Sequence, residues 1–78
     1  MNLEQIFGKV LKKVRIEKGL SQEKLAEYCM LDRTYISLLE RGLRQPTLKT
    51  IFSIANALEI SPTVLIQEVE KLNENFKD

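Results

Sequence analysis

The sequence has little of what enzymes and metal sites are built from. Its 78 residues include no histidine, no tryptophan and one cysteine, Cys29. It contains no glycine-rich phosphate loop, and no cysteines or carboxylates cluster at the spacing of metal ligands. No general base stands beside Cys29 in a motif for nucleophilic catalysis. We therefore expect no enzyme, and neither a metal nor a cofactor.

The scarcity of cysteine and the lack of long apolar runs also limit where the chain works. A lone cysteine cannot form an intramolecular disulfide, which fits a reducing cytosol. No apolar run is long enough to span a membrane, and the first nine residues lack the pattern of a signal peptide. We expect a cytoplasmic protein with no membrane partner. Cys29 is expected to pack as a small hydrophobe, the alternative being a redox sensor.

The charge is small but unevenly distributed. The net charge is +1, too low for a protein that coats DNA by electrostatics alone. Residues 1–49 carry ten Lys or Arg against six Asp or Glu, whereas residues 50–78 carry two against five. A basic part that faces DNA, followed by an acidic part, is one interpretation, and chance scatter in a short chain is the other.

Helical periodicity runs through the chain, and no segment alternates long enough for a strand. We predict one all-α domain over residues 1–78 with helices at about 3–18, 22–29, 33–42, 48–58 and 62–73. The expected N-caps are Asn2 (with Gln5), Ser21, Asp32, Thr47 and Ser61, the last followed by Pro62. The expected buried residues are Leu3, Ile6, Phe7, Val10, Leu11 and Val14 in the first helix and Leu48, Ile51, Phe52, Ala55 and Leu58 in the fourth. At 44% apolar residues the core is small, so a second copy could add burial.

Residues 22–41, QEKLAEYCMLDRTYISLLER, have the layout of a helix-turn-helix. Ala26 supplies a small residue where the two helices cross, and Asp32 caps the second helix after a short turn. The inner apolar positions are Leu25, Cys29, Leu31, Ile36 and Leu39. The second helix of such a motif lies in the major groove of DNA. A generic helical hairpin is the alternative.

Four phrases carry a resemblance to a known family: RIEKGLSQEKLA, DRTYIS, LLERG and PTLKTIFSIANALEIS. The chain resembles the λ-repressor-like (XRE-type) helix-turn-helix regulators, and most of all the controller proteins of bacterial restriction-modification systems. The resemblance implies a compact five-helix DNA-binding domain and a homodimer. It also implies a regulator that binds a pseudo-palindromic operator and controls its own operon. Being short, the chain is expected to bind no small-molecule ligand.

Three positions are interpreted through this resemblance. Met30 stands where the family has glycine, in a turn that tends to be left-handed, so we expect a strained turn. Arg15 and Glu40 occupy positions that pair in the family and tie the first helix to the third. We therefore assign Arg15 a structural role, worth about 0–1 kcal/mol if the pair is exposed.

The predicted DNA contacts centre on the second helix of the motif. Arg33 is the first choice for reading a guanine edge, with a phosphate contact as the alternative. Thr34 and Ser37 follow, as base or phosphate contacts or as solvated side chains. The resemblance gives Gln22 a phosphate contact and a bracing role. For Tyr35, a phosphate contact and packing on the scaffold are rated equally. The remaining DNA-binding candidates, in and beside the loop after the third helix, are Arg41, Arg44, Gln45 and Thr47.

A homodimer is expected because one helix-turn-helix reads only a few base pairs. The predicted two-fold contact is a stripe on the last helix, made of Leu65, Val69, Leu72 and Phe76, with Val64 and Ile66 beside it and with help from the end of the fourth helix. The alternative is that these residues close the monomer core. Activation would require RNA polymerase, for which Glu23 and Glu27 are candidate contacts or simply a solvated face. A protein-interaction module such as an antitoxin is the second hypothesis for function.

Overall fold

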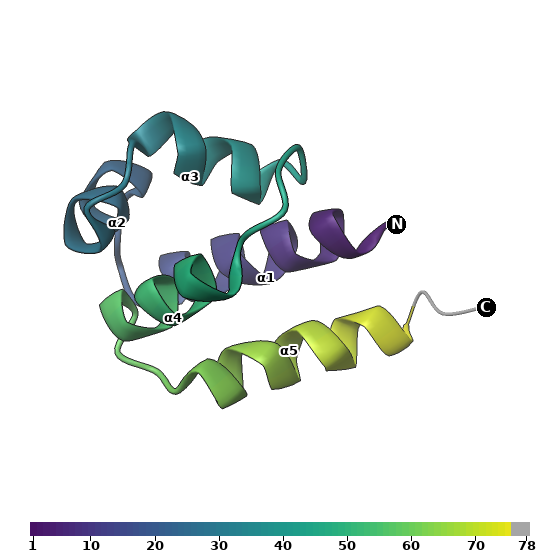
Figure 1. Cartoon of the computed structure of the whole chain (residues 1–78). Coiled ribbons are helices and arrows are strands. Elements are labelled where there is room, and N and C mark those ends of the chain that lie inside the picture. The colour runs from purple at the N-terminus through teal and green to yellow at the C-terminus, as the bar shows by residue number, and fades with distance from the viewer. Residues whose placement is uncertain (76–78) are drawn as a thin grey trace.

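The computed structural model describes residues 1–75, and these form five α-helices joined by short loops (Figure 1). The helices are α1 (Leu3–Glu17), α2 (Gln22–Cys29), α3 (Arg33–Glu40), α4 (Leu48–Ala57) and α5 (Pro62–Glu74). The prediction of an all-α, five-helix chain is confirmed, and each helix lies within about two residues of its expected bounds. No helix within residues 1–75 is both long and apolar enough to cross a membrane.

Every helix directly follows the residue that the sequence predicts as its N-cap. Asn2 and Gln5 form a reciprocal capping box, in which each side chain accepts a hydrogen bond from the other residue's backbone N–H, at 2.9 and 2.8 Å. The other four caps accept a backbone N–H in the first turn: Ser21 from Lys24, Asp32 from Thr34, Thr47 from Thr50 and Ser61 from Thr63. Each cap satisfies an N–H that the helix itself cannot, so the helix starts are encoded locally.

Four residues in the described chain have positive φ, and all of them follow a helix. Gly19 and Gly42 have φ of 73°, and glycine adopts this conformation without steric cost. Met30 and Glu59 have φ of 57° and 58°, in a region that a residue with a side chain occupies only at a cost. The left-handed turn at Met30 is confirmed. The one at Glu59 was not predicted.

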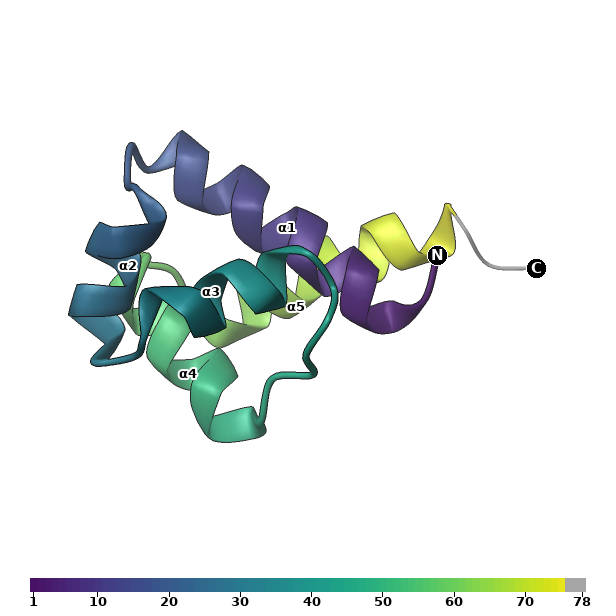
Figure 2. The same ribbon diagram turned by 90° about the horizontal axis from the view of Figure 1, so that it is seen from above.

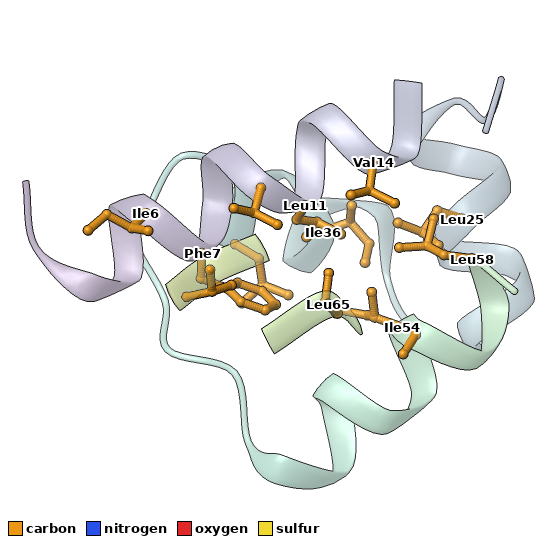
Figure 3. Close-up of a cluster of buried hydrophobic side chains, with 14 residues drawn as sticks. Ile6, Phe7, Leu11, Val14, Leu25, Ile36, Ile54, Leu58 and Leu65 are labelled. Carbon is orange, nitrogen blue, oxygen red and sulfur yellow. The ribbon is translucent and has the colours of Figure 1, made fainter. Parts of the chain in front are cut away.

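The core lies between α1 and the other four helices (Figure 3). Helix α1 packs against α3 and α5, while α4 packs against α2 and α5. The largest fully buried side chains are Ile6, Leu11, Leu25, Ile36, Leu39, Ile54, Leu58 and Leu65. Burying each such side chain stabilises the fold by about 1.5–3 kcal/mol relative to leaving it exposed. The helix-turn-helix residues Leu25, Ile36 and Leu39 are thus part of the same core that holds the domain together.

Three residues predicted to be buried are exposed. Leu3 is 54% exposed, Leu48 72% and Phe52 55%, whereas Ile54, which was not predicted, is completely buried. The side chains of Ile54 in α4 and of its C-cap Leu58 turn toward the core, and those of Leu48 and Phe52 turn away from it. Helix α4 has apolar residues on more than one face, so helical spacing alone could not identify the face that its neighbours cover.

Helices α1 and α3 are in direct backbone contact at Gly8. A Cβ atom at this position would lie 2.4 Å from the carbonyl oxygen of Leu39 and 2.5 Å from that of Glu40. Both distances are far below van der Waals contact, so only glycine fits without a shift of one helix. Gly8 therefore fixes how closely the last turn of α3 approaches α1.

Candidate nucleic-acid interface

Helix α3 lies on the outside of the molecule, on the side opposite α5 (Figures 1 and 2). One face of α3 is anchored by Ile36 and Leu39, both completely buried. Arg33 and Thr34, at its start, are exposed, and Ser37 is half-buried. The helix therefore presents its polar side to solvent while its apolar side is held by the core. A helix with this arrangement can enter a groove without unfolding any part of the domain.

The start of α3 is fixed by Asp32. Its carboxylate accepts a hydrogen bond from the backbone N–H of Thr34 at 2.8 Å, which is the geometry of an N-cap. The expectation that Asp32 is a cap is confirmed. Arg33 immediately follows this cap and is the first residue of α3. Its exposed side chain therefore lies at the N-terminal end of the helix, from which a recognition helix contacts base edges.

The turn before α3 is held by backbone hydrogen bonds around Met30. The N–H of Leu31 donates to the carbonyl of Ala26 at 2.9 Å, and the N–H of Met30 donates to that of Glu27 at 3.2 Å. Met30 has φ of 57° and ψ of 40°, and its side chain is 92% exposed. Ala26 is 3% exposed, in accordance with a small residue at the helix crossing. The turn is thus intact although Met30 carries a side chain in the left-handed conformation.

Arg15, Gln22 and Glu40 form a hydrogen-bonded cluster beneath the motif. Arg15 Nε lies 2.6 Å from Glu40 Oε2, and Arg15 Nη2 lies 3.1 Å from Glu40 Oε1. Gln22 Nε2 donates to the same Oε1 at 3.0 Å. The predicted pairing of Arg15 with Glu40 is therefore present, and the bracing role of Gln22 is a hydrogen bond to the end of α3. Its predicted phosphate contact stays a prediction.

The expected contribution of the Arg15–Glu40 pair assumed that both side chains are exposed, and they are not. The Arg15 and Glu40 side chains are 10% and 3% exposed. The bound of about 0–1 kcal/mol holds only for exposed pairs, so it does not apply. Removal of one partner would leave the other charge buried without compensation, which in proteins costs about 3–5 kcal/mol.

The loop after α3 presents several polar side chains. Arg41, Arg44, Gln45 and Thr47 are all exposed. The Thr47 hydroxyl caps α4 by accepting from the N–H of Thr50 at 3.1 Å, so a structural role is already established for it. The ring of Tyr35 is half-buried and packs against the core, as the scaffold interpretation expects. Contacts from these residues to DNA stay predictions.

The predicted dimer stripe is wrong for two of its residues. Leu65 is completely buried and Val69 is 8% exposed, because α5 turns this face toward α1 in the monomer. Leu72 is half-buried against the same core, and Phe76 lies outside the described residues. These side chains mainly close the monomer core, which was the alternative. They offer little surface to a second copy.

A different apolar surface is exposed on α4 and α5, and we call it the α4–α5 patch. Leu48 and Phe52 come from α4, and Ile66, 44% exposed, comes from α5. Together with the half-buried Ile51 they line one groove, which Pro62 and Thr63 extend. The sequence analysis placed Ile66 beside the predicted dimer stripe but assigned Leu48 and Phe52 to the core, so it found only part of this surface. The apolar residues on a second face of α4 were the signal that could have found it.

Cys29 shows no feature of a reactive site. Burial raises the pKa of its thiol, and its Sγ atom lies 3.8 Å from the carbonyl oxygen of Ser53. A raised pKa keeps the group as the unreactive thiol at neutral pH. Within residues 1–75, no three His, Cys, Asp or Glu side chains are placed to hold a metal ion.

Helices α2 and α3 bury their apolar faces and are joined by a short left-handed turn, and α3 is capped and faces solvent. These features define a helix-turn-helix DNA-binding domain. Comparison with known proteins identifies the family. The helix-turn-helix family model matches residues 11–65, and the chain belongs to this family. The XRE-type recognition made from the sequence is thereby confirmed.

The similar proteins include controller proteins of restriction-modification systems, as the sequence resemblance indicated. The control protein C.BamHI of Bacillus amyloliquefaciens is 44% identical over 66 residues, covering 83% of this chain and 82% of the relative. The controller protein C.AhdI of Aeromonas hydrophila superposes with a TM-score of 0.77 at 45% identity, over 80% of this chain and 94% of its own. The controller C.Esp1396I, solved as a tetramer with its natural 35-base-pair operator, has a TM-score of 0.84 at 42% identity, over 92% and 95%.

Proposed function

We propose that this chain is a sequence-specific transcriptional regulator that binds a pseudo-palindromic operator as a homodimer and controls the restriction-modification operon to which it belongs. The observation that carries the proposal is the exposed polar face of α3, on which Arg33 and Thr34 stand free while Ile36 and Leu39 anchor the opposite face. The similarity to controller proteins, one of them solved on its operator, supports the same assignment.

The contacts divide into two kinds. Arg33 would donate two hydrogen bonds to a guanine edge, and Thr34 and Ser37 would touch neighbouring bases or phosphates. The DNA backbone on either side would be contacted by Gln22, Tyr35, Arg41, Arg44, Gln45 and Thr47. Base contacts select the sequence, whereas backbone contacts fix the register of the domain on the duplex.

The α4–α5 patch is the surface that we assign to the second copy. One helix-turn-helix reads a single half-site, and two half-sites lie about 34 Å apart on one side of the duplex. A two-fold contact uses the same patch on both copies, so Leu48 and Phe52 of one protomer would meet the equivalent surface of the other. Exposed large apolar side chains at 72% and 55% exposure would be covered by this arrangement.

The proposal also includes RNA polymerase as a partner and the cytoplasm as the place of action. A regulator that activates would contact RNA polymerase and would act in the cytoplasm. Glu23 and Glu27 are exposed on α2, but Glu27 lies 3.8 Å from Lys24 Nζ, which favours a solvated face over a contact surface. The interaction-module hypothesis would instead require the α4–α5 patch to stay open in the homodimer.

The test is binding to DNA from immediately upstream of the protein's own gene, with excess random competitor at near-physiological salt. The parent should protect a pseudo-palindrome. Arg33→Ala should lose about 1–3 kcal/mol of discrimination, because a bidentate contact to guanine is removed. Lys12→Ala is the matched control, since Lys12 is an exposed cation on α1, outside the helix-turn-helix, and it should keep the preference for the operator.

The outcomes separate the hypotheses. If each of the two variants, Arg33→Ala and Lys12→Ala, weakens binding to operator DNA and to random DNA by the same factor, Arg33 contacts only phosphate. If the parent binds upstream DNA no tighter than random DNA, this operator is wrong or the chain is an interaction module. A selection from random DNA pools would then distinguish those two possibilities.

A further inference from the structure

The Arg15–Gln22–Glu40 cluster joins three helices at one carboxylate. Arg15 comes from α1, Gln22 is the first residue of α2, and Glu40 is the last residue of α3. Glu40 Oε1 accepts two hydrogen bonds, from Gln22 Nε2 at 3.0 Å and from Arg15 Nη2 at 3.1 Å, while Oε2 accepts from Arg15 Nε at 2.6 Å. The orientation of the Gln22 amide is thus set by a group at the far end of α3.

Arg15 also fixes the chain that leads into α2. Its Nη1 donates to the carbonyl oxygen of Leu20 at 2.7 Å, and Leu20 immediately precedes Ser21, the N-cap of α2. The guanidinium therefore holds both the start of α2 and the end of α3. Because its side chain is only 10% exposed, it is poorly placed to contact a phosphate itself.

We propose that this cluster sets the affinity for the operator by holding Gln22 ready for DNA. The Gln22 amide has two N–H groups, and only one of them donates to Glu40. The second donates to a backbone phosphate when the protein docks. Arg15 and Glu40 are then positioning residues that touch no DNA. This inference rests on the proposed function.

The physical basis is preorganisation combined with charge neutralisation. A free glutamine side chain would lose rotamer entropy on contacting phosphate, and here that entropy is already lost in the unbound protein. Glu40 alone would place a negative charge 3.0 Å from the amide nitrogen that meets the phosphate. The Arg15 guanidinium cancels that charge, so the amide is held without repelling DNA.

The experiment removes both charged members together. Arg15→Met combined with Glu40→Leu keeps the net charge and leaves no buried unpaired charge, and apolar replacement of a buried ion pair often preserves stability. The matched control is Lys13→Met with Glu68→Gln, because this pair also joins α1 to another helix, at 3.8 Å, away from the motif. Dissociation constants are measured on operator and on random DNA at one salt concentration, with urea unfolding to give the folded fraction.

The Arg15→Met/Glu40→Leu variant should bind the operator about tenfold more weakly, the size of one charge-assisted hydrogen bond. Its affinity for random DNA should fall by a similar factor, because a backbone phosphate is contacted on any sequence. The control should match the parent on both DNAs. Gln22→Ala should weaken the parent about tenfold, but cost the double variant less than threefold, since its amide is no longer held.

Three results would overturn the inference. Operator binding equal to that of the parent would show that the cluster serves stability alone. Tighter binding would show that Gln22 leaves Glu40 on DNA, so that the cluster competes with the operator. A full tenfold loss from Gln22→Ala in the double variant would show that the amide needs no positioning. A parent that does not prefer operator to random DNA would instead refute the proposed function.

Arg15→Lys gives a second test that does not depend on the fold of the double variant. Lysine keeps the neutralising charge, but a single ammonium group cannot replace the guanidinium fork that reaches both Glu40 oxygens and the Leu20 carbonyl. Operator affinity should fall in the same direction and by about threefold. Unchanged affinity in Arg15→Lys would mean that charge alone matters and positioning does not.

Discussion

Met30 occupies a conformation that suits a residue without a side chain. Its φ of 57° is in the left-handed region, and its side chain is 92% exposed and packs on nothing that would compensate. Met30→Gly should therefore raise the free energy of unfolding by about 1 kcal/mol, as relief of the left-handed strain exceeds the added freedom of the unfolded chain. Urea unfolding measures this change.

Two substitutions act as controls for the turn. Glu59→Gly replaces the other non-glycine residue with positive φ, at 58°, and should also stabilise. Lys18→Gly lies at a helix C-cap with φ of −84° and should give no gain. A lower urea midpoint for Met30→Gly, or an equal gain at Lys18, would show that backbone strain is not the cause.

At the scale of helices, the approach of α1 to α3 depends on Gly8. In an ordinary helix, replacing glycine by alanine stabilises by about 0.5–1 kcal/mol. Here a Cβ would lie 2.4 Å from the Leu39 carbonyl oxygen, so α3 must move. Gly8→Ala should destabilise by about 1–3 kcal/mol, the usual cost of overpacking, as measured by urea unfolding.

The matched control for Gly8→Ala is Lys12→Ala on the exposed side of the same helix, which should change stability by less than about 0.5 kcal/mol. Operator affinity of Gly8→Ala should also fall, because α3 carries the predicted base contacts. An increase in its urea midpoint would mean that α1 and α3 separate at little cost.

Helix α4 shows where helical spacing stops being informative. Ile51, Ala55 and Leu58 satisfy the period of a buried stripe together with Leu48 and Phe52, and equally well together with Ile54. The structure buries Ile54 completely and exposes Leu48 and Phe52. Periodicity identifies the helix, but the position of α2 and α5 decides which side is covered.

At the scale of the whole molecule, the proposed dimer contact through the α4–α5 patch can be tested by substitution. Phe52→Lys should weaken dimerisation by about 3 kcal/mol or more, roughly 100-fold, because a two-fold contact loses two buried phenyl groups and gains two like charges. Sedimentation over a concentration series measures the association. Operator binding should weaken in parallel, since a monomer reads one half-site.

Ile16→Lys is the matched control for this surface. Ile16 is 57% exposed, close to the 55% of Phe52, but lies near the end of α1 and away from the patch. It should leave dimerisation unchanged, and circular dichroism should show that both variants are folded. A Phe52→Lys protein that remains dimeric at the concentration of the parent would place the interface elsewhere.

The sequence by itself determined the features whose partners lie within a few residues. The five N-caps satisfy backbone groups in their own first turn, so Ser21, Asp32 and Thr47 could be identified without a fold. The family resemblance added the pairing of Arg15 with Glu40 and the likeness to controller proteins. Arg15 and Glu40 are 25 residues apart in sequence, and no local pattern would have paired them.

Only the tertiary structure decided what depends on the packing of distant helices. It placed Leu65 and Val69 inside the core and left Leu48 and Phe52 outside, reversing the predicted roles of these residues. It also buried the Arg15–Glu40 pair and brought Gln22 onto the same carboxylate. The physical reason is that a side chain's environment is set by neighbouring helices, whereas local sequence sets only the conformation of its own helix.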